Sequence, residues 1–174
     1  MKTTRIMALA SLAVLCATGA LAQSSASSGN GFYAELGYSP VEVYGAGGDA
    51  KPTGARLVVG YELNKNMGLE AMYTGNTTKD GRVGYDASFN GFGLMLKPKA
   101  ALSEDTEVFA RVGAMRADIT ASSSGTSADT DFAYGIGVQT NFNKSLYGQL
   151  DYMRSYDRNS ISAKGYTLSL GIRF

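Results

Sequence analysis

The sequence predicts an all-β protein, an eight-stranded antiparallel up-and-down β-barrel that crosses a membrane, and three observations lead to this fold class. Apolar residues recur at every second position in eight segments between Gly31 and Phe174, which is the period of a strand and not of a helix. Short connections alternate with longer polar ones. The composition fits strands, because the chain holds 22 Gly and 11 Tyr and only 18% of its residues are charged.

The first 22 residues have the three parts of an export signal. Lys2 and Arg5 form a positive start, and residues 6–17 form a mostly apolar stretch that is too short to span a bilayer as a helix. Ala20-Leu21-Ala22 then provides a small-x-small cleavage site. We therefore expect export from the cytoplasm and cleavage after Ala22.

The signal at residues 1–22 is followed by two further parts of the chain. Residues 23–30 are rich in Ser and have no apolar pattern, so we expect a flexible periplasmic N-terminal tail. Residues 31–174 are expected to form the outer-membrane β-barrel. The single cysteine, Cys16, lies inside the signal, so the mature chain should contain neither a disulfide nor a thiolate.

Each of the eight segments carries apolar residues on one face. In the first half of the chain these residues are Phe32, Ala34, Leu36 and Tyr38 in 31–43, Ala55, Leu57, Val59 and Tyr61 in 53–63, Met67, Leu69, Ala71 and Tyr73 in 67–77, and Phe92, Leu94 and Leu96 in 87–97. In the second half they are Val108, Ala110, Val112 and Ala114 in 106–117, Phe132, Tyr134, Ile136, Val138 and Phe142 in 131–142, Leu146, Leu150 and Tyr152 in 145–156, and Tyr166, Leu168, Leu170, Ile172 and Phe174 in 165–174.

The opposite face of the segments is small, polar or charged. A soluble barrel such as a lipocalin has the same period of two, but with an apolar interior. An eight-stranded barrel has an interior just wide enough to be filled by side chains, which suits the Gly-rich, charged face. The other face suits lipid, and its Tyr and Phe residues gather toward the strand ends, as in the two aromatic girdles of membrane barrels. The final strand also ends on an aromatic residue, Phe174, which we expect of a membrane barrel.

The connections between the segments alternate in length. Asn64-Lys65-Asn66 and Asn143-Lys144 are predicted tight turns, in which Asn tolerates a positive φ. The longer polar connections are 44–52, 78–86, 118–130 and 157–164. Short periplasmic turns and long external loops are typical of outer-membrane barrels. The connection at 98–105 is longer than this pattern predicts for a periplasmic turn.

Charged residues on the inward face form the best candidate site. At middle depth, Glu35, Glu70 and Asp151 are expected to face Arg56 and Arg111 as a lumen charge network. Charges enclosed in a narrow barrel must pair, so this set predicts a salt-bridge plug. A gate, in which a change of partners opens a small pore, is the alternative. A second group is expected near the periplasmic rim: Glu62, Lys97, Glu107 and Arg173.

The sequence offers no catalytic, metal or cofactor site. It contains no His, the side chain that most often acts as a base near neutral pH, and nothing near Ser122–Ser124 would activate a hydroxyl. A net charge of +1 does not suit nucleic acid. We therefore expect no enzyme but a structural or surface-interaction protein that acts through its external loops. A narrow channel or small-solute binder is the alternative, and a hydrolase of envelope lipid is disfavoured by the missing His.

Two stretches carry a family resemblance. The run from Asp131 to Phe142 and the closing run from Gly165 to Phe174 resemble the last third of small outer-membrane barrels, namely outer membrane protein X, the Ail-type surface proteins and the transmembrane domain of outer membrane protein A. The resemblance implies that the barrel-assembly machinery reads the last strand. The residues read there would be Tyr166, Leu168, Leu170, Ile172 and Phe174.

We accordingly expect a monomer in the outer membrane of a Gram-negative bacterium. The expected partners are outer-membrane lipid and lipopolysaccharide, periplasmic chaperones, the barrel-assembly machinery, and a surface ligand or host protein.

Overall fold

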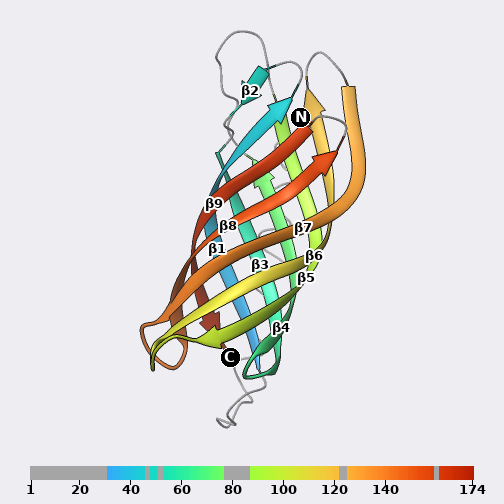
Figure 1. The fold of residues 1–174 in the computed structure, drawn as a ribbon. Helices are drawn as coiled ribbons and strands as arrows, with labels where there is room; N and C mark the ends of the chain where they lie inside the picture. Colours follow the sequence, from blue (N-terminus) through green and yellow to red (C-terminus); the bar gives the residue numbers. More distant parts are fainter. Residues whose placement is uncertain (1–30, 46–47, 51–52, 77–86, 122–124, 159–160) are drawn as a thin grey trace, which may run out of the picture.

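All eight predicted segments form long β-strands, and a short ninth strand follows the first. The computed structural model describes residues 31–45, 48–50, 53–76, 87–121, 125–158 and 161–174. The strands, labelled in Figure 1, are β1 (Phe32–Gly45), β2 (Gly48–Ala50), β3 (Thr53–Asn64), β4 (Met67–Asn76), β5 (Ala87–Ala101), β6 (Thr106–Ala121), β7 (Gly125–Asn141), β8 (Leu146–Arg158) and β9 (Ile161–Arg173).

The long strands form one closed antiparallel sheet. Each pairs with its neighbour in the chain, and β9 returns to pair with β1 from Tyr33↔Arg173 to Tyr44↔Ser162. β2 folds back on the end of β1 as a short hairpin. Closure pairs the backbone groups that an open edge would expose, as a strand structure in lipid requires. The predicted fold class, an eight-stranded up-and-down barrel, is confirmed. No helix long and apolar enough to cross a membrane occurs among the described residues.

Three short connections lie at one end of the barrel, which we call the short-turn end: residues 65–66, 102–105 and 142–145. The two Asn turns are capped locally, since Asn64 Oδ1 accepts the N–H of Asn66 at 2.8 Å and Asn143 Oδ1 accepts that of Leu146 at 2.7 Å. The long connection predicted at 98–105 is wrong, because β5 continues through Pro98 to Ala101. Pro98 lies opposite Met67, the first residue of β4, so its missing N–H falls where that ladder ends.

The strands reach further toward the opposite end than the sequence predicted. β6 and β7 are paired up to Ala121↔Gly125, and β8 and β9 up to Arg158↔Ile161, so the loops predicted at 118–130 and 157–164 are mostly strand. The apolar period misses these extensions because strands that leave the lipid need no apolar face. The segment 44–52 likewise contains β2. The predicted loop at 78–86 lies outside the described residues, as do the signal at 1–22 and the tail at 23–30.

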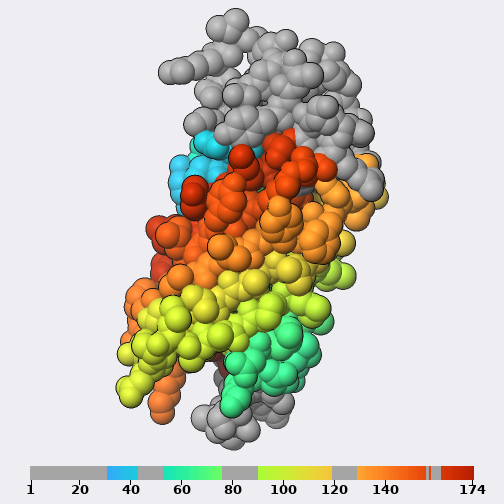
Figure 2. All heavy atoms as spheres, in the orientation of Figure 1, coloured from blue at the N-terminus to red at the C-terminus, as the bar shows by residue number. Residues whose placement is uncertain are grey.

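The apolar faces of the strands point outward, as predicted. Leu36, Ile136 and Leu168 are each more than 60% exposed. Outward aromatic pairs lie at two depths. Phe32 and Tyr61 lie near the short-turn end with ring centroids 5.0 Å apart, and Tyr152 and Tyr166 lie midway along β8 and β9 with centroids 4.8 Å apart. In the space-filling view the side chains of neighbouring strands form a continuous wall (Figure 2). An apolar surface of this kind is stable in lipid and not in water.

Candidate functional site in the barrel interior

A layer of six charged side chains crosses the barrel interior, and we call it the charge layer. It contains the five residues predicted from the sequence and one more, and none of the six is more than 3% exposed. Its members come from six different strands: Glu35 (β1), Arg56 (β3), Glu70 (β4), Lys97 (β5), Arg111 (β6) and Asp151 (β8).

Arg111 lies at the centre of the charge layer and contacts all three carboxylates. Its Nε is 2.6 Å from Glu70 Oε2, its Nη2 is 2.7 Å from Glu35 Oε2, and its Nη1 is 2.9 Å from Asp151 Oδ1. A guanidinium presents five N–H donors in a rigid plane, so one Arg can bind three acids from three strands at once. Arg111 therefore links β1, β4 and β8 from its own strand, β6.

Asp151 is shared between two arginines. Arg56 donates from both of its terminal nitrogens to the two oxygens of Asp151, with Nη1 at 2.9 Å from Oδ2, and Arg111 donates to Oδ1. With Lys97 included, three cations face three carboxylates. Such a layer has no net charge, which lowers the cost of enclosing ions away from water.

Lys97 does not lie at the rim, where the sequence analysis expected it. Its Nζ is 2.9 Å from Glu35 Oε1 and 3.4 Å from Glu70 Oε1, and it donates to Gln139 Oε1 at 3.2 Å and Gln149 Oε1 at 3.1 Å. The long apolar stem of a lysine lets its ammonium lie well away from its backbone position. The prediction that Lys97 belongs to the rim group is therefore wrong, because its ammonium lies in the charge layer.

A separate rim cluster lies at the short-turn end and contains the other three predicted residues. Lys99, which the sequence analysis did not include, takes the position expected for Lys97. Its Nζ is 2.6 Å from Glu62 Oε2 and 3.7 Å from Glu107 Oε2. Arg173 Nε is 3.8 Å from Glu62 Oε1. These groups are more exposed than the charge layer, so their ion pairs are screened more strongly.

Three aromatic rings lie inside the barrel beside the charge layer, and all three are placed by the same arrangement. In each case an aromatic residue, a glycine and an acid lie in register on three consecutive strands of the barrel wall, and the ring lies over the glycine. A Cβ on that glycine would be 2.2–2.4 Å from the ring. The three rows are Tyr33–Gly60–Glu70, Phe109–Gly137–Asp151 and Tyr147–Gly171–Glu35.

The three rings surround the ammonium of Lys97. The distances from Nζ to the ring centroids are 5.2 Å for Tyr33, 4.6 Å for Phe109 and 5.8 Å for Tyr147, within the range of cation–π attraction. The two phenols also donate to carboxylates, Tyr33 to Glu70 and Tyr147 to Glu35, both at 2.9 Å.

Sequence reasoning missed these inward aromatics, although a signal for them was present. Tyr33 and Phe109 each lie two residues before a charge-layer residue of the same strand, Glu35 and Arg111, and therefore on the same face.

A second interior layer, which we call the methionine layer, lies between the charge layer and the end opposite the short turns. It is buried and apolar, and Arg56 Nη1 touches it at 3.8 Å from Met153 Sδ. The prediction that the inward face is only small, polar or charged is therefore wrong in this half of the barrel. The layer consists of Val41, Val58, Met72, Met95, Met115, Ala117, Ala133, Met153 and Ala163.

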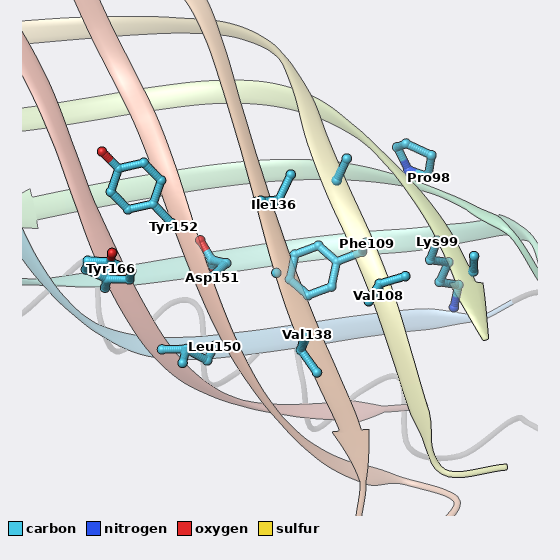
Figure 3. A pocket seen from close by; sticks show the side chains of 13 residues that line it. Pro98, Lys99, Val108, Phe109, Ile136, Val138, Leu150, Asp151, Tyr152 and Tyr166 are labelled. Carbon is cyan, nitrogen blue, oxygen red and sulfur yellow. The ribbon is translucent and has the colours of Figure 1, made fainter. Parts of the chain in front are cut away.

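The outer wall has a shallow apolar depression across β5–β9. Val108, Ile136, Val138 and Leu150 line it (Figure 3). Phe109 also borders it but is only 5% exposed, because its ring lies on the inner side of the wall. This lining suits hydrocarbon and provides no cluster of groups for chemistry. The described residues also contain no group of three or more His, Cys, Asp or Glu that would hold a metal ion.

The residues of the predicted assembly signal alternate along β9 on its outer face. Tyr166, Leu168, Leu170 and Ile172 are between 43% and 65% exposed. Phe174 follows the strand, and its N–H donates to the carbonyl of Phe32 at 2.9 Å. Tyr166, Leu168, Leu170 and Ile172 are therefore presented to the outside of the barrel and not to its interior.

Comparison with known proteins agrees with this architecture. The model of the outer membrane protein beta-barrel domain family matches residues 7–174. Comparison with curated protein sequences finds no match.

Several solved barrels share the fold. Ail, the attachment invasion locus protein of Yersinia pestis, solved with the heparin analogue sucrose octasulfate, is 22% identical with a TM-score of 0.62, covering 84% of this chain and 99% of its own. Neisserial surface protein A is 18% identical with a TM-score of 0.60, covering 84% and 98%. The N-terminal barrel of Pseudomonas aeruginosa OprF is 15% identical with a TM-score of 0.59, covering 83% and 99%.

Proposed function

The chain belongs to the outer membrane protein beta-barrel domain family, and from this premise we propose that it is a closed barrel with a structural and surface-interaction role. The proposal has two parts. The charge layer plugs the lumen, and the contacts of the protein are made by its external loops, at the end opposite the short turns. Export would depend on the signal at residues 1–22, and assembly would depend on the outward face of β9.

The charge-balanced layer is the observation that carries the proposal. Its six charged groups come from six of the eight long strands, and Gln139 of β7 joins them through Lys97. An ion that crossed this depth would have to separate groups such as Arg111 and Glu70, and breaking a buried pair leaves an uncompensated charge. The methionine layer adds a mostly apolar barrier, within which Ser39 and Thr167 satisfy each other by a hydrogen bond of 2.9 Å, and burial beside apolar groups is costly for a hydrated ion.

Single-channel recording tests the plug. We expect the folded wild-type protein, reconstituted in planar bilayers, to pass almost no current in potassium chloride. Arg111→Ala, which removes the central guanidinium and much of its volume, should pass more current than wild type. A large and stable wild-type conductance would contradict the plug and favour the narrow channel.

Two observations support the surface role: the fold, and the charged residues on the outer side of the strands at the end opposite the short turns. A barrel of this fold, Ail, has been solved with a sulfated sugar analogue. At the end of this chain opposite the short turns, described outer residues carry both signs, since Arg116 lies 3.9 Å from Asp118 and Arg154 pairs with Asp157. A surface of mixed charge favours a protein partner, which can present both signs, over a uniformly sulfated chain.

Crosslinking in intact cells tests the surface role. A photo-crosslinker at Arg116, which is 65% exposed in its side chain, should capture a defined partner or lipopolysaccharide, whereas one at Ser145 on the short-turn end should not. The same product at both positions would contradict a role confined to the outer end.

A further inference from the structure

The ammonium of Lys97 occupies a site that is built as a receptor for a small cation. Nζ donates three hydrogen bonds, to Glu35 at 2.9 Å, Gln149 at 3.1 Å and Gln139 at 3.2 Å, and Glu70 Oε1 lies a little further away, at 3.4 Å. A primary alkylammonium group has three N–H donors, so each donor has an acceptor in this site. Every one of these acceptor residues is at most 3% exposed.

Aromatic rings complete the enclosure of this site. Tyr33, Phe109 and Tyr147 turn their rings toward Nζ at centroid distances of 5.2, 4.6 and 5.8 Å. Rings arranged around a cation in this way form the cages that proteins use to recognise ammonium ligands. The glycines under the rings, Gly60 and Gly171 among them, fix the ring positions because no Cβ fits there. The cage is therefore built by the barrel wall and not by Lys97 itself.

The charge count shows what the site would require without Lys97. The remaining charge layer would contain the three carboxylates of Glu35, Glu70 and Asp151 and only two guanidiniums, those of Arg56 and Arg111. A buried excess of one negative charge attracts a cation. Because the acceptors and rings come from β1, β6, β7 and β8, they remain assembled when a residue of β5 is changed.

We propose that the barrel interior contains a binding site for a primary alkylammonium ion or ammonium, and that Lys97 is its tethered occupant. In the native protein this occupant keeps free cations out of the lumen. Only the role given to the occupant, which is to exclude free cations, rests on the proposed function of the charge layer as a plug. The binding site itself is independent of whether wild type conducts.

Chemical rescue of Lys97→Ala, which removes the side chain beyond Cβ and leaves room for a small alkylammonium ion, tests the site. The full chain is refolded from urea into detergent micelles with ethylammonium chloride, or with sodium chloride or tetramethylammonium chloride at the same ionic strength, and the folded fraction is measured at equilibrium. We expect ethylammonium to raise the folding equilibrium constant saturably, by about elevenfold at ten times its Kd. Tetramethylammonium has no N–H donor for the three acceptors, so it should not rescue.

Two comparisons make the test specific. Wild type should show no ethylammonium effect, because its site is occupied. Lys99→Ala should show none either, because it removes a lysine of the same strand from the rim cluster, outside the cage. Equal folding of Lys97→Ala in ethylammonium and sodium, including failure to fold in both, would overturn the proposal, as would an equal rescue of Lys99→Ala. Wild-type current in planar bilayers would overturn the plug and leave the rescue result unaffected.

Discussion

The charge layer and the methionine layer fill the same narrow barrel in different ways. In the charge layer each group has defined partners, and Arg111 alone contacts acids from three strands. In the methionine layer, Met72 and Met115 fill space beside apolar neighbours, and their flexible thioether chains adapt to irregular gaps. The comparison shows that one barrel diameter can require specific pairing at one depth and only correct volume at another.

Removing one partner from the charge layer should have the largest effect. Glu70→Gln leaves Arg111 short of one carboxylate, and breaking a buried pair costs about 3–5 kcal/mol. Adding Arg111→Met should recover part of this loss, because Glu35 and Asp151 then face Lys97 and Arg56 in balanced numbers. Urea unfolding in detergent or lipid measures both. Strictly additive effects in the double-mutant cycle would show that the layer is not one coupled network.

A charge on the lipid face should have the next largest effect, for a reason unrelated to pairing. Leu150 is 52% exposed on the outer wall, and Leu150→Arg should cost about 2–4 kcal/mol if it lies near the middle of the bilayer. Ser145→Arg at a short turn is the matched control and should be nearly neutral. The measurement is unfolding in lipid vesicles. A harmless Leu150→Arg, or a harmless Val112→Arg on β6, would mean that the two faces are assigned the wrong way round.

Replacing a glycine that lies under an aromatic ring should lower the free energy of unfolding by less than either of the two charge changes above. A Cβ at Gly171 would lie 2.2 Å from the ring of Tyr147, so Gly171→Ala must displace the ring that donates to Glu35, at a cost of about 1–3 kcal/mol. Gly75→Ala is the control, because its Cβ would come no closer than 3.3 Å to its neighbours. Equal unfolding midpoints for the two variants would show that the rings do not depend on their glycines.

The sequence predicted the wall of the barrel well because the wall obeys a local rule. Alternation assigns Leu36 and Glu35 to opposite faces without any knowledge of the partners across the barrel. The same rule placed Arg56 and Arg111 on the inward face, and the structure brings them to Glu35, Glu70 and Asp151.

Depth and reach were harder to predict than the faces. Lys97 was assigned to the rim because alternation gives a backbone position and not the place of an ammonium at the end of a long side chain. Met115 was missed because an apolar residue on the charged face breaks the pattern from which faces are read. Such positions depend on neighbours far away in the chain, such as the space that Gly93 leaves beside Met115.

The smallest effect should come from a volume-conserving change in the methionine layer. Met115 is fully buried, and no described hydrogen bond or ion pair involves its side chain, so Met115→Leu should cost less than about 1.5 kcal/mol. Met153→Leu is the informative companion, because Met153 Sδ accepts a contact from Arg56 at 3.8 Å where the two layers meet. We expect Met153→Leu to exceed Met115→Leu in the loss of unfolding free energy, measured in the same detergent. If Met115→Leu instead costs as much as Glu70→Gln, the sulfur at that position has a specific partner, and the distinction between a paired layer and a filled layer fails.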